Sequence, residues 1–355
     1  MQCIVHRMGQ SETVGTRAEE LSHLAAAVSQ VLGKPAVLIE DLSYSSRAVV
    51  ARLDLGGGET AIAKKPFEWE SFTSEVEALR ILPPETRPAL LGTGDGVLVM
   101  EDLGTGPSVA DVLLSPGGAP AERALESWAG TVGRALRATL RRGVPTAPLE
   151  LGDGVAELVA VAGGFGIAAP AGVEDDVRVI VDTFSSQSPW LAYCPGDTCP
   201  DNNRVFDDGS VRLFDFEGSG WRHAATEAAY CRAPFCTCWC IATLPAGITD
   251  MMEAAFLDAL DPPHRSELCA AIGLADASWS LMPFAGYLRR FVHEAPPIGP
   301  RGLIDGRQLA VLRLDSVQSQ GDRLPALAQL AGGVRDEVIR RWPEAAELPP
   351  YPAFS

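Results

Sequence analysis

Two short motifs joined by a predicted β-hairpin constrain the fold of this 355-residue chain more than any other feature. The first is G-D-T-C-P-D-N at residues 196–202, and the second is D-F-E at residues 215–217. Between them, two short apolar strands flank the turn D-D-G-S, in which glycine can adopt a positive φ. Because a hairpin brings its open ends together, we expect Asn202 and Asp215 to share one edge, with Asp197 on the loop beside them.

These three side chains are suited to phosphoryl transfer. Carboxylate and amide oxygens are ligands that Mg²⁺ prefers, so Asn202 and Asp215 can share a divalent cation. Asp197 can orient an acceptor hydroxyl and accept its proton, in a reaction where the protein mainly positions groups and neutralises charge. Acidic turn residues are common in loops, but the joint spacing favours the functional interpretation.

The same residues resemble the motifs of a known superfamily. C-P-G-D-T-C-P-D-N at 194–202 and L-F-D-F-E at 213–217 look like the H-G-D-x-x-P-x-N and D-F-E motifs of the aminoglycoside phosphotransferase and choline kinase superfamily. The resemblance implies an α+β, two-lobed protein-kinase-like fold, with a small N-terminal antiparallel β-sheet lobe carrying one helix and a larger, mostly helical C-terminal lobe. It also implies ATP and Mg²⁺ as cofactors. Pro195 replaces the family's His, which helps to hold the catalytic loop, and this departure leaves a catalytically silent protein as an alternative.

The resemblance places a nucleotide-binding lysine upstream of these motifs. Residues 59–66, E-T-A-I-A-K-K-P, predict a strand ending in lysine, and Lys64 corresponds to the family lysine that contacts the α- and β-phosphates. Residues 71–82 predict a helix with an apolar face, and Glu75 lies at the margin of that face. A carboxylate turned inward requires a cation, so we expect Glu75 to pair with Lys64.

Two further segments resemble parts of the family's nucleotide lobe and follow the same order along the chain. Ser45 and Ser46 lie in a loop of small residues between two predicted strands, where backbone N-H groups and hydroxyls could cover the phosphates. The segment L-V-M-E-D-L resembles the family's hinge, so the backbone around Glu101 and Leu103 would bind the adenine edge, with Met100 or the preceding valine packing nearby.

The motif order predicts two parts: a nucleotide-binding lobe at 1–103 and a helical lobe at 104–355 that carries the catalytic loop and the acceptor pocket. Apolar periodicity and Pro or Gly breaks predict helices. The predicted ranges are 17–32, 121–142, 250–260, 267–272, 279–292, 308–318 and 324–342.

Acidic residues near the acceptor pocket are candidates for binding a cationic substrate. They are Glu217, Glu227 and Asp250, although solvated helix acids are the simpler explanation for each taken singly. The formal net charge of -17 argues against nucleic acid or an anionic membrane as the main partner and slightly favours an amine-bearing acceptor. The absence of an A-P-E segment after Asp215 favours a small molecule over a protein as acceptor.

Composition predicts a soluble, cytoplasmic protein, and the sequence does not decide between a monomer and a homodimer. Hydrophobic residues make up 46% of the chain, and the N-terminal residues lack the apolar core of a signal peptide. The cysteines at 231–240 are spaced poorly for zinc, so we expect them to pack as small buried hydrophobes in a reducing compartment.

The sequence therefore predicts an ATP-dependent O-phosphotransferase that phosphorylates a hydroxyl of a small molecule, cationic or not, which is either an antibiotic, as in a resistance enzyme, or a metabolite. Two alternatives remain open: a silent nucleotide-binding or regulatory protein, and a kinase of primary metabolism for choline, a sugar or an amino alcohol. The sequence does not decide between ATP and GTP as donor.

Overall fold

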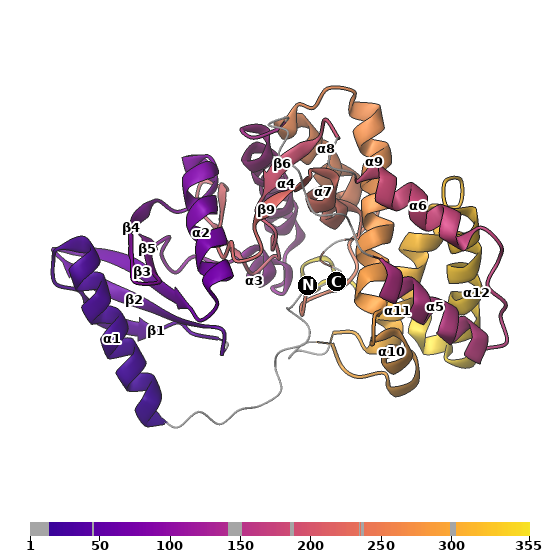
Figure 1. Ribbon diagram of the computed structural model, residues 1–355, viewed down its shortest axis with the longest axis horizontal. Coiled ribbons are helices and arrows are strands. Elements are labelled where there is room, and N and C mark those ends of the chain that lie inside the picture. The colour runs from indigo at the N-terminus through magenta and orange to yellow at the C-terminus, as the bar shows by residue number, and fades with distance from the viewer. Residues whose placement is uncertain are drawn as a thin grey trace.

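The computed structural model describes residues 14–44, 46–140, 151–184, 188–233, 235, 238–298 and 303–355, with side chains from residue 17 onward. A five-stranded antiparallel sheet forms the N-terminal part, and a larger helical region follows it (Figure 1). This arrangement is the α+β, two-lobed architecture that the motifs predict.

The sheet has the strand order β1-β2-β3-β5-β4. Its strands are β1 (Val37–Asp41), β2 (Ala48–Gly56), β3 (Glu59–Pro66), β4 (Leu90–Gly94) and β5 (Val97–Glu101). Successive side chains of a strand point to opposite faces, so Val97 and Val99 join one buried cluster while Leu98 and Met100 join another. The sheet consequently has two covered faces.

Each face is covered by one helix. α1 (Val14–Leu32) packs its Leu24 and Val28 against the face of Val99, and α2 (Trp69–Ile81) packs against the face of Met100. In Figure 1, α1 lies on the outer side of the sheet and α2 on the side of the helical region. The N-terminal helix, predicted at 17–32 without a role, therefore closes the outer face of the sheet.

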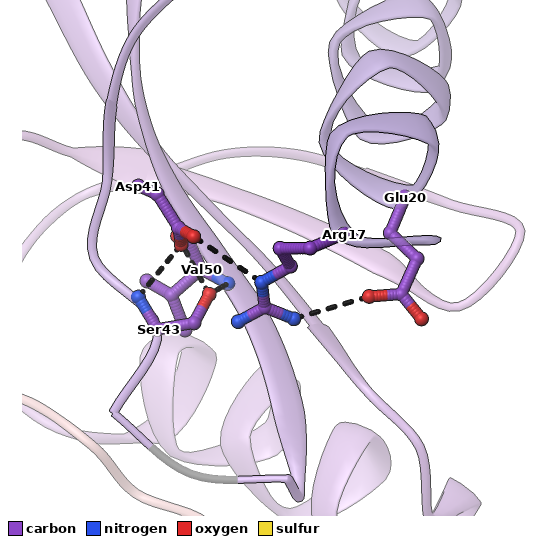
Figure 2. Close-up of polar contacts among 5 residues, drawn as sticks. All are labelled: Arg17, Glu20, Asp41, Ser43 and Val50. Carbon is purple, nitrogen blue, oxygen red and sulfur yellow. Dashed lines mark hydrogen bonds and ion pairs between the residues drawn. The ribbon is translucent and has the colours of Figure 1, made fainter. Parts of the chain in front are cut away.

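Polar contacts fasten the first turns of α1 to the end of β1 (Figure 2). Arg17 Nε donates to Asp41 Oδ2 at 3.2 Å, and its Nη1 lies 3.1 Å from Glu20 Oε2. Asp41 Oδ1 also accepts from the Ser43 N-H at 3.0 Å, and the Ser43 hydroxyl bonds the Val50 backbone. These contacts hold the start of the β1–β2 connection against α1.

The C-terminal part is built on one continuous apolar core. Its central helix α4 (Gly118–Arg137) buries Leu125, Trp128, Val132 and Leu136, which are spaced along one helical face as the periodicity predicts. The other helices are α3 (Val109–Leu113), α5 (Gly152–Gly164), α6 (Val173–Thr183), α7 (Ala225–Arg232), α8 (Ile248–Leu260), α9 (Arg265–Leu281), α10 (Leu288–Glu294), α11 (Gly306–Gln318) and α12 (Pro325–Arg341). Short 3₁₀ segments occupy Pro84–Thr86, Met282–Phe284, Pro343–Ala346 and Pro352–Phe354.

Two small antiparallel pairs interrupt the helices. β6 (Leu191–Cys194) pairs with β9 (Gly220–His223), and β7 (Asn203–Val205) pairs with β8 (Val211–Leu213). The chain segments between these strands carry the motifs at 196–202 and 215–217, so the two pairs frame the predicted site.

Three helix predictions need correction. The helices predicted at 267–272 and 279–292 are instead a continuous α9, a 3₁₀ turn and the shorter α10. Gly273 lies inside α9, so this glycine does not end the helix. The helix predicted at 121–142 begins earlier and ends at Arg137, and its last two predicted residues lie outside the described ones.

Within the described part of the chain, no single helix is long and apolar enough to cross a bilayer. Arg265–Phe284 and Leu288–Glu294 reach that length and hydropathy only as a pair, with a bend of 71° between them.

Candidate active site

The hairpin β7–β8 brings the two motifs together as predicted. Asn203 pairs with Leu213, and the Phe214 N-H donates to the Asn202 carbonyl at 3.0 Å. Asn202 and Asp215 therefore lie at the open end of the hairpin.

An ionic cluster joins this hairpin to the sheet and to α2. Lys64 Nζ on β3 lies 2.7 Å from Glu75 Oε2 on α2 and also forms an ion pair with Asp215. Lys64 is 6% exposed and Glu75 is fully buried, whereas Lys65 is exposed. The predicted Lys64–Glu75 pair is present, and Asp215 of the D-F-E motif completes it.

Burial and charge oppose each other in this cluster. Burial disfavours the Lys64 ammonium, but the carboxylates of Asp215 and Glu75 outweigh burial and raise the lysine pKa. Burial raises the pKa of Glu75, Lys64 opposes that rise, and the charges of Asp215 and Glu217 add to it. The cluster thus places the carboxylates of Glu75 and Asp215 in contact with the Lys64 ammonium, with Glu217 close enough to act on Glu75.

Backbone geometry places the two motif loops in direct contact. Gly196 has a φ of 93°, and a Cβ there would lie 2.0 Å from the Gly218 carbonyl oxygen, so only glycine fits. Asp215 also has a positive φ, 65°, in the left-handed region that Asp tolerates better than most residues. The loop of Asp197 therefore lies directly against the loop that follows D-F-E.

Asp197 is partly exposed on this loop, and its carbonyl accepts from Asn202 Nδ2 at 3.1 Å. The buried carboxyl of Glu227 on α7 lies beneath it. Burial raises the pKa of Glu227, the charge of Arg222 opposes the rise, and the nearby charge of Asp197 adds to it. Glu227 thus supports the loop from the core side.

Asn203 is a loop-organising residue that the sequence analysis missed. Its fully buried side chain accepts from the Val109 N-H at 2.9 Å and donates to the carbonyls of Pro200 and Cys199 at 2.9 and 3.3 Å. It therefore joins the loop to the start of α3. Its only signal in the sequence is a polar residue at the first position of a predicted strand.

A disulfide corrects the prediction for the cysteines. Cys199, inside the G-D-T-C-P-D-N motif, is bonded to Cys238. Next to this bond, Trp239 Nε1 donates to Asp201 Oδ2 at 2.6 Å. Cys231 is a buried thiol, as predicted, but Cys238 is not, and Cys236 lies outside the described residues. The motif loop and the segment after α7 are therefore joined by both a covalent bond and a hydrogen bond.

The hinge prediction falls on the end of β5 and the residues after it. Met100 is buried on the face that carries Lys64, because Ile62 pairs with Met100 and Lys64 with Leu98. Strand alternation therefore selects Met100, not Val99, as the residue facing the cleft. The Glu101 carboxylate accepts from Arg212 and from the Ala89 N-H, each at 3.0 Å.

Beyond Glu101, the chain turns toward the helical region. Asp102 accepts from Arg52, Thr60 and the Gly104 N-H; burial acts to raise its pKa, but these bonds hold it below the ordinary value. Leu103 is half-buried, and none of the hydrogen bonds seen among the described residues uses its backbone. The Leu103 N-H and carbonyl can therefore meet an adenine edge.

The loop between β1 and β2 reaches the D-F-E motif. Ser45 lies outside the described residues, and Ser46 is exposed in the turn before β2. The next residue, Arg47, forms an ion pair with Glu217. The predicted phosphate-covering loop therefore lies close to Glu217, through a residue that sequence reasoning did not select.

The three acids predicted to bind a substrate occupy different environments. Glu217 pairs with Arg47, Glu227 is buried beneath the Asp197 loop, and Asp250 is exposed in the first turn of α8. Of the three, only Glu217 is both partly exposed and next to the ionic cluster.

The donor set fits a magnesium–nucleotide complex. Among the described residues, no three His, Cys, Asp or Glu side chains form a metal cluster. Magnesium commonly uses one or two protein oxygens and completes its shell with water and phosphate oxygens, so Asn202 and Asp215 suffice. Lys64 adds a cation for phosphates.

Searches with protein-family models and among curated proteins found no match to this sequence. Among solved structures, an aminoglycoside phosphotransferase from Alicyclobacillus acidocaldarius aligns with a TM-score of 0.50 and 14% identity, covering 94% of this chain and 98% of that one. A putative fructosamine-3-kinase from Thermobifida fusca gives 0.48 and 18%, covering 74% and 92%. The macrolide 2'-phosphotransferase of Brachybacterium faecium gives 0.47 and 13%, covering 88% and 98%. The first of these matches shows that the chain has the fold of that aminoglycoside phosphotransferase.

Proposed function

We propose that this protein is an ATP-dependent O-phosphotransferase that transfers the γ-phosphate of Mg-ATP to a hydroxyl of a small, cationic molecule. The observation that carries the proposal is the cluster of Lys64, Glu75 and Asp215. It joins the sheet, α2 and the hairpin at the point where the Asp197 loop lies. A buried lysine held between two carboxylates is positioned to exchange one of them for a phosphate.

Each side chain has a separate role in this reaction. Asp197 orients the acceptor hydroxyl and accepts its proton as the new bond to phosphorus forms. Asn202 and Asp215 hold Mg²⁺, which neutralises phosphate charge when it is bound. Lys64, kept in place by Glu75, binds the nucleotide phosphates. The backbone at Leu103, with Met100 packed behind it, receives the adenine.

The acceptor is proposed to be small and cationic because of the charge around the site. The chain carries a net charge of -17, and Glu217 adds a partly exposed carboxylate two residues from Asp215. A negative field draws cations toward a cleft. The solved structure from Alicyclobacillus acidocaldarius is an aminoglycoside phosphotransferase, and aminoglycosides carry both amines and hydroxyls, so this class is the first acceptor to test.

An acceptor screen with γ-labelled ATP tests the proposal directly. Aminoglycosides, macrolides, peptide antibiotics and choline-like amino alcohols would each be incubated with wild-type protein and Mg²⁺, and labelled product would be separated from ATP. We expect label on at least one hydroxylated amine with the wild type and a strong loss with Asp197→Asn. Label on choline or a sugar alone would instead indicate a kinase of primary metabolism.

The competing function is a nucleotide-binding protein without turnover, and Pro195 is the observation that favours it. Binding of Mg-ATP with equal affinity by wild-type and Asp197→Asn proteins, together with no product from any acceptor, would support that function and contradict ours. The contacts of the Asp197 loop argue against a function without turnover. Asn203, Glu227 and the Cys199–Cys238 bond hold this loop, a role that His has in the family.

A further inference from the structure

Arg47 lies at the tip of the β1–β2 connection, and its backbone is held in place. Its carbonyl accepts from the Phe67 N-H at 2.9 Å, and the next residue, Ala48, pairs with Pro66 in the β2–β3 ladder. The Arg47 side chain, which has several rotatable bonds, can therefore move while its backbone stays in place.

The Arg47 guanidinium reaches across to the helical region. It forms an ion pair with Glu217, whose side chain is 15% exposed. The charge of Glu217 is close enough to the buried Glu75 to raise the pKa of Glu75. Arg47 thus lies at the same ionic cluster as Lys64, although Lys64 is on β3 and Arg47 is in the loop before β2.

Each of the two acids of D-F-E pairs with a different cation. Lys64 pairs with Asp215 and Arg47 pairs with Glu217. A cation in a partly buried cleft requires an anion, and removing its partner leaves a costly unpaired charge. A carboxylate can therefore occupy the position of a phosphate until the nucleotide arrives.

We propose that Arg47 is a phosphate-binding residue of the nucleotide site, an inference that rests on the proposed function. With no nucleotide bound, it pairs with Glu217; with Mg-nucleotide bound, its guanidinium turns to the terminal phosphates. The planar guanidinium donates paired hydrogen bonds that match phosphate oxygens. This cation would strengthen a phosphate-covering loop that the sequence builds from serines and not from a glycine-rich motif.

A fixed latch between the two parts of the molecule is the alternative role for the same ion pair. The two roles predict different effects for the two partners. If the pair is a latch, removing either charge opens it, so Arg47→Gln and Glu217→Gln should change nucleotide affinity in the same direction. If Arg47 binds phosphate, Glu217 competes with the nucleotide, so the two substitutions should differ.

Calorimetric titration with AMP, ADP and a hydrolysis-resistant ATP analogue, each with Mg²⁺, distinguishes these roles without measuring catalysis. For Arg47→Gln we expect about 10- to 100-fold weaker binding of the ATP analogue, because charged hydrogen bonds are lost. The loss should be smaller for ADP and absent for AMP. For Glu217→Gln we expect equal or tighter binding of the ATP analogue, and for Arg47→Lys an intermediate loss.

Arg80→Gln is the matched control, since it removes the same charge from an exposed position on α2, and we expect wild-type affinities. Equal weakening by Arg47→Gln and Glu217→Gln, or a loss that is the same for AMP and the ATP analogue, would overturn the proposal. If Arg47→Gln does not fold, weaker binding by Glu217→Gln decides against it. Absence of nucleotide binding by the wild type would instead refute the proposed function.

Discussion

At the scale of single residues, Asp197 has its position fixed by neighbours on both sides of its loop. Asn202 bonds its carbonyl, and Gly196 before it packs against Gly218. Asp197→Asn keeps the size of the side chain but removes the proton acceptor. We expect the turnover number to fall by about 10²- to 10⁴-fold with little change in nucleotide affinity. Initial rates with a responsive acceptor and a parallel binding titration measure the two effects.

Asp207→Asn provides the matched control for this experiment. Asp207 is exposed at the tip of the β7–β8 hairpin, so its substitution removes the same charge from the same motif region, and the rate should remain that of the wild type. A normal rate with Asp197→Asn would remove Asp197 from the catalytic role.

Asp215→Ala should separate metal binding from nucleotide binding. Alanine removes one of two predicted magnesium ligands and leaves Lys64 without its second carboxylate. We expect nucleotide affinity to lose its dependence on Mg²⁺, which in the wild type should rise with metal concentration. Titrations of ADP across a range of Mg²⁺ concentrations measure this. An unchanged magnesium dependence would exclude Asp215 as a ligand.

Sequence reasoning located residues whose roles follow from spacing, and it missed residues whose roles depend on long-range contacts. Helical periodicity predicted that Glu75 points inward, and its predicted ion pair with Lys64 is present. Arg47 and Asn203 carried no comparable signal, because their partners Glu217 and Val109 lie far away in the chain. A side chain's partner across the fold cannot be read from its local pattern.

At the scale of elements, the loop of residues 196–202 depends on the segment after α7. The Cys199–Cys238 bond closes a stretch with a sequence separation of 39, and restricting the unfolded chain in this way commonly stabilises a protein by about 2–4 kcal/mol. We expect Cys238→Ser to lower the free energy of unfolding by a similar amount. Urea denaturation followed by fluorescence, without reductant, measures it.

Reduction of the wild type gives an internal control for that loss. Dithiothreitol should lower the stability of the wild type to about that of Cys238→Ser and should not change the variant further. If reductant destabilises both proteins equally, the loss comes from another source than this bond.

Element predictions succeeded where apolar periodicity was strong, and they missed shorter or glycine-bounded helices such as α5, α6 and α7. The helices α2 and α4 follow clear apolar faces. The sequence analysis assigned no helix to α5, which both begins and ends with glycine. Gly154 lies in its first turn because a Cβ there would be 2.1 Å from the Leu281 carbonyl oxygen. Packing between helices thus overrides the low helix propensity of glycine.

At the scale of the whole molecule, polar contacts add to the apolar core that α2 and the Met100 face of the sheet share with the helical region. Besides the two ion pairs of D-F-E, the Tyr193 hydroxyl and the Ser219 hydroxyl lie 2.9 Å apart, and both bond the Ser74 carbonyl on α2. Ser74 precedes Glu75, so these bonds position the helix that holds Lys64. These polar contacts can be exchanged for contacts with a charged ligand, while the shared apolar core keeps the two parts together.

Global stability should depend on the ionisation of Asp276, inside the helical core. This carboxyl on α9 is 4% exposed, and burial raises its pKa to about 7, against the opposing effects of the Ser316 hydroxyl and the Arg232 charge. The folded protein therefore holds a proton there that the unfolded chain releases above its ordinary pKa of 3.8. Folding stability falls as pH rises through this window and levels off above pH 7.

Asp276→Asn should remove this dependence, because the amide can still accept from Ser316 but does not ionise. Between pH 5 and pH 8 we expect the stability of the variant to rise by about 2–3 kcal/mol relative to the wild type. Urea denaturation at a series of pH values measures the difference. Asp182→Asn, which removes an exposed carboxyl from α6, should follow the wild-type profile. If Asp276→Asn also parallels the wild type from pH 5 to pH 8, the buried carboxyl does not control this part of the stability curve.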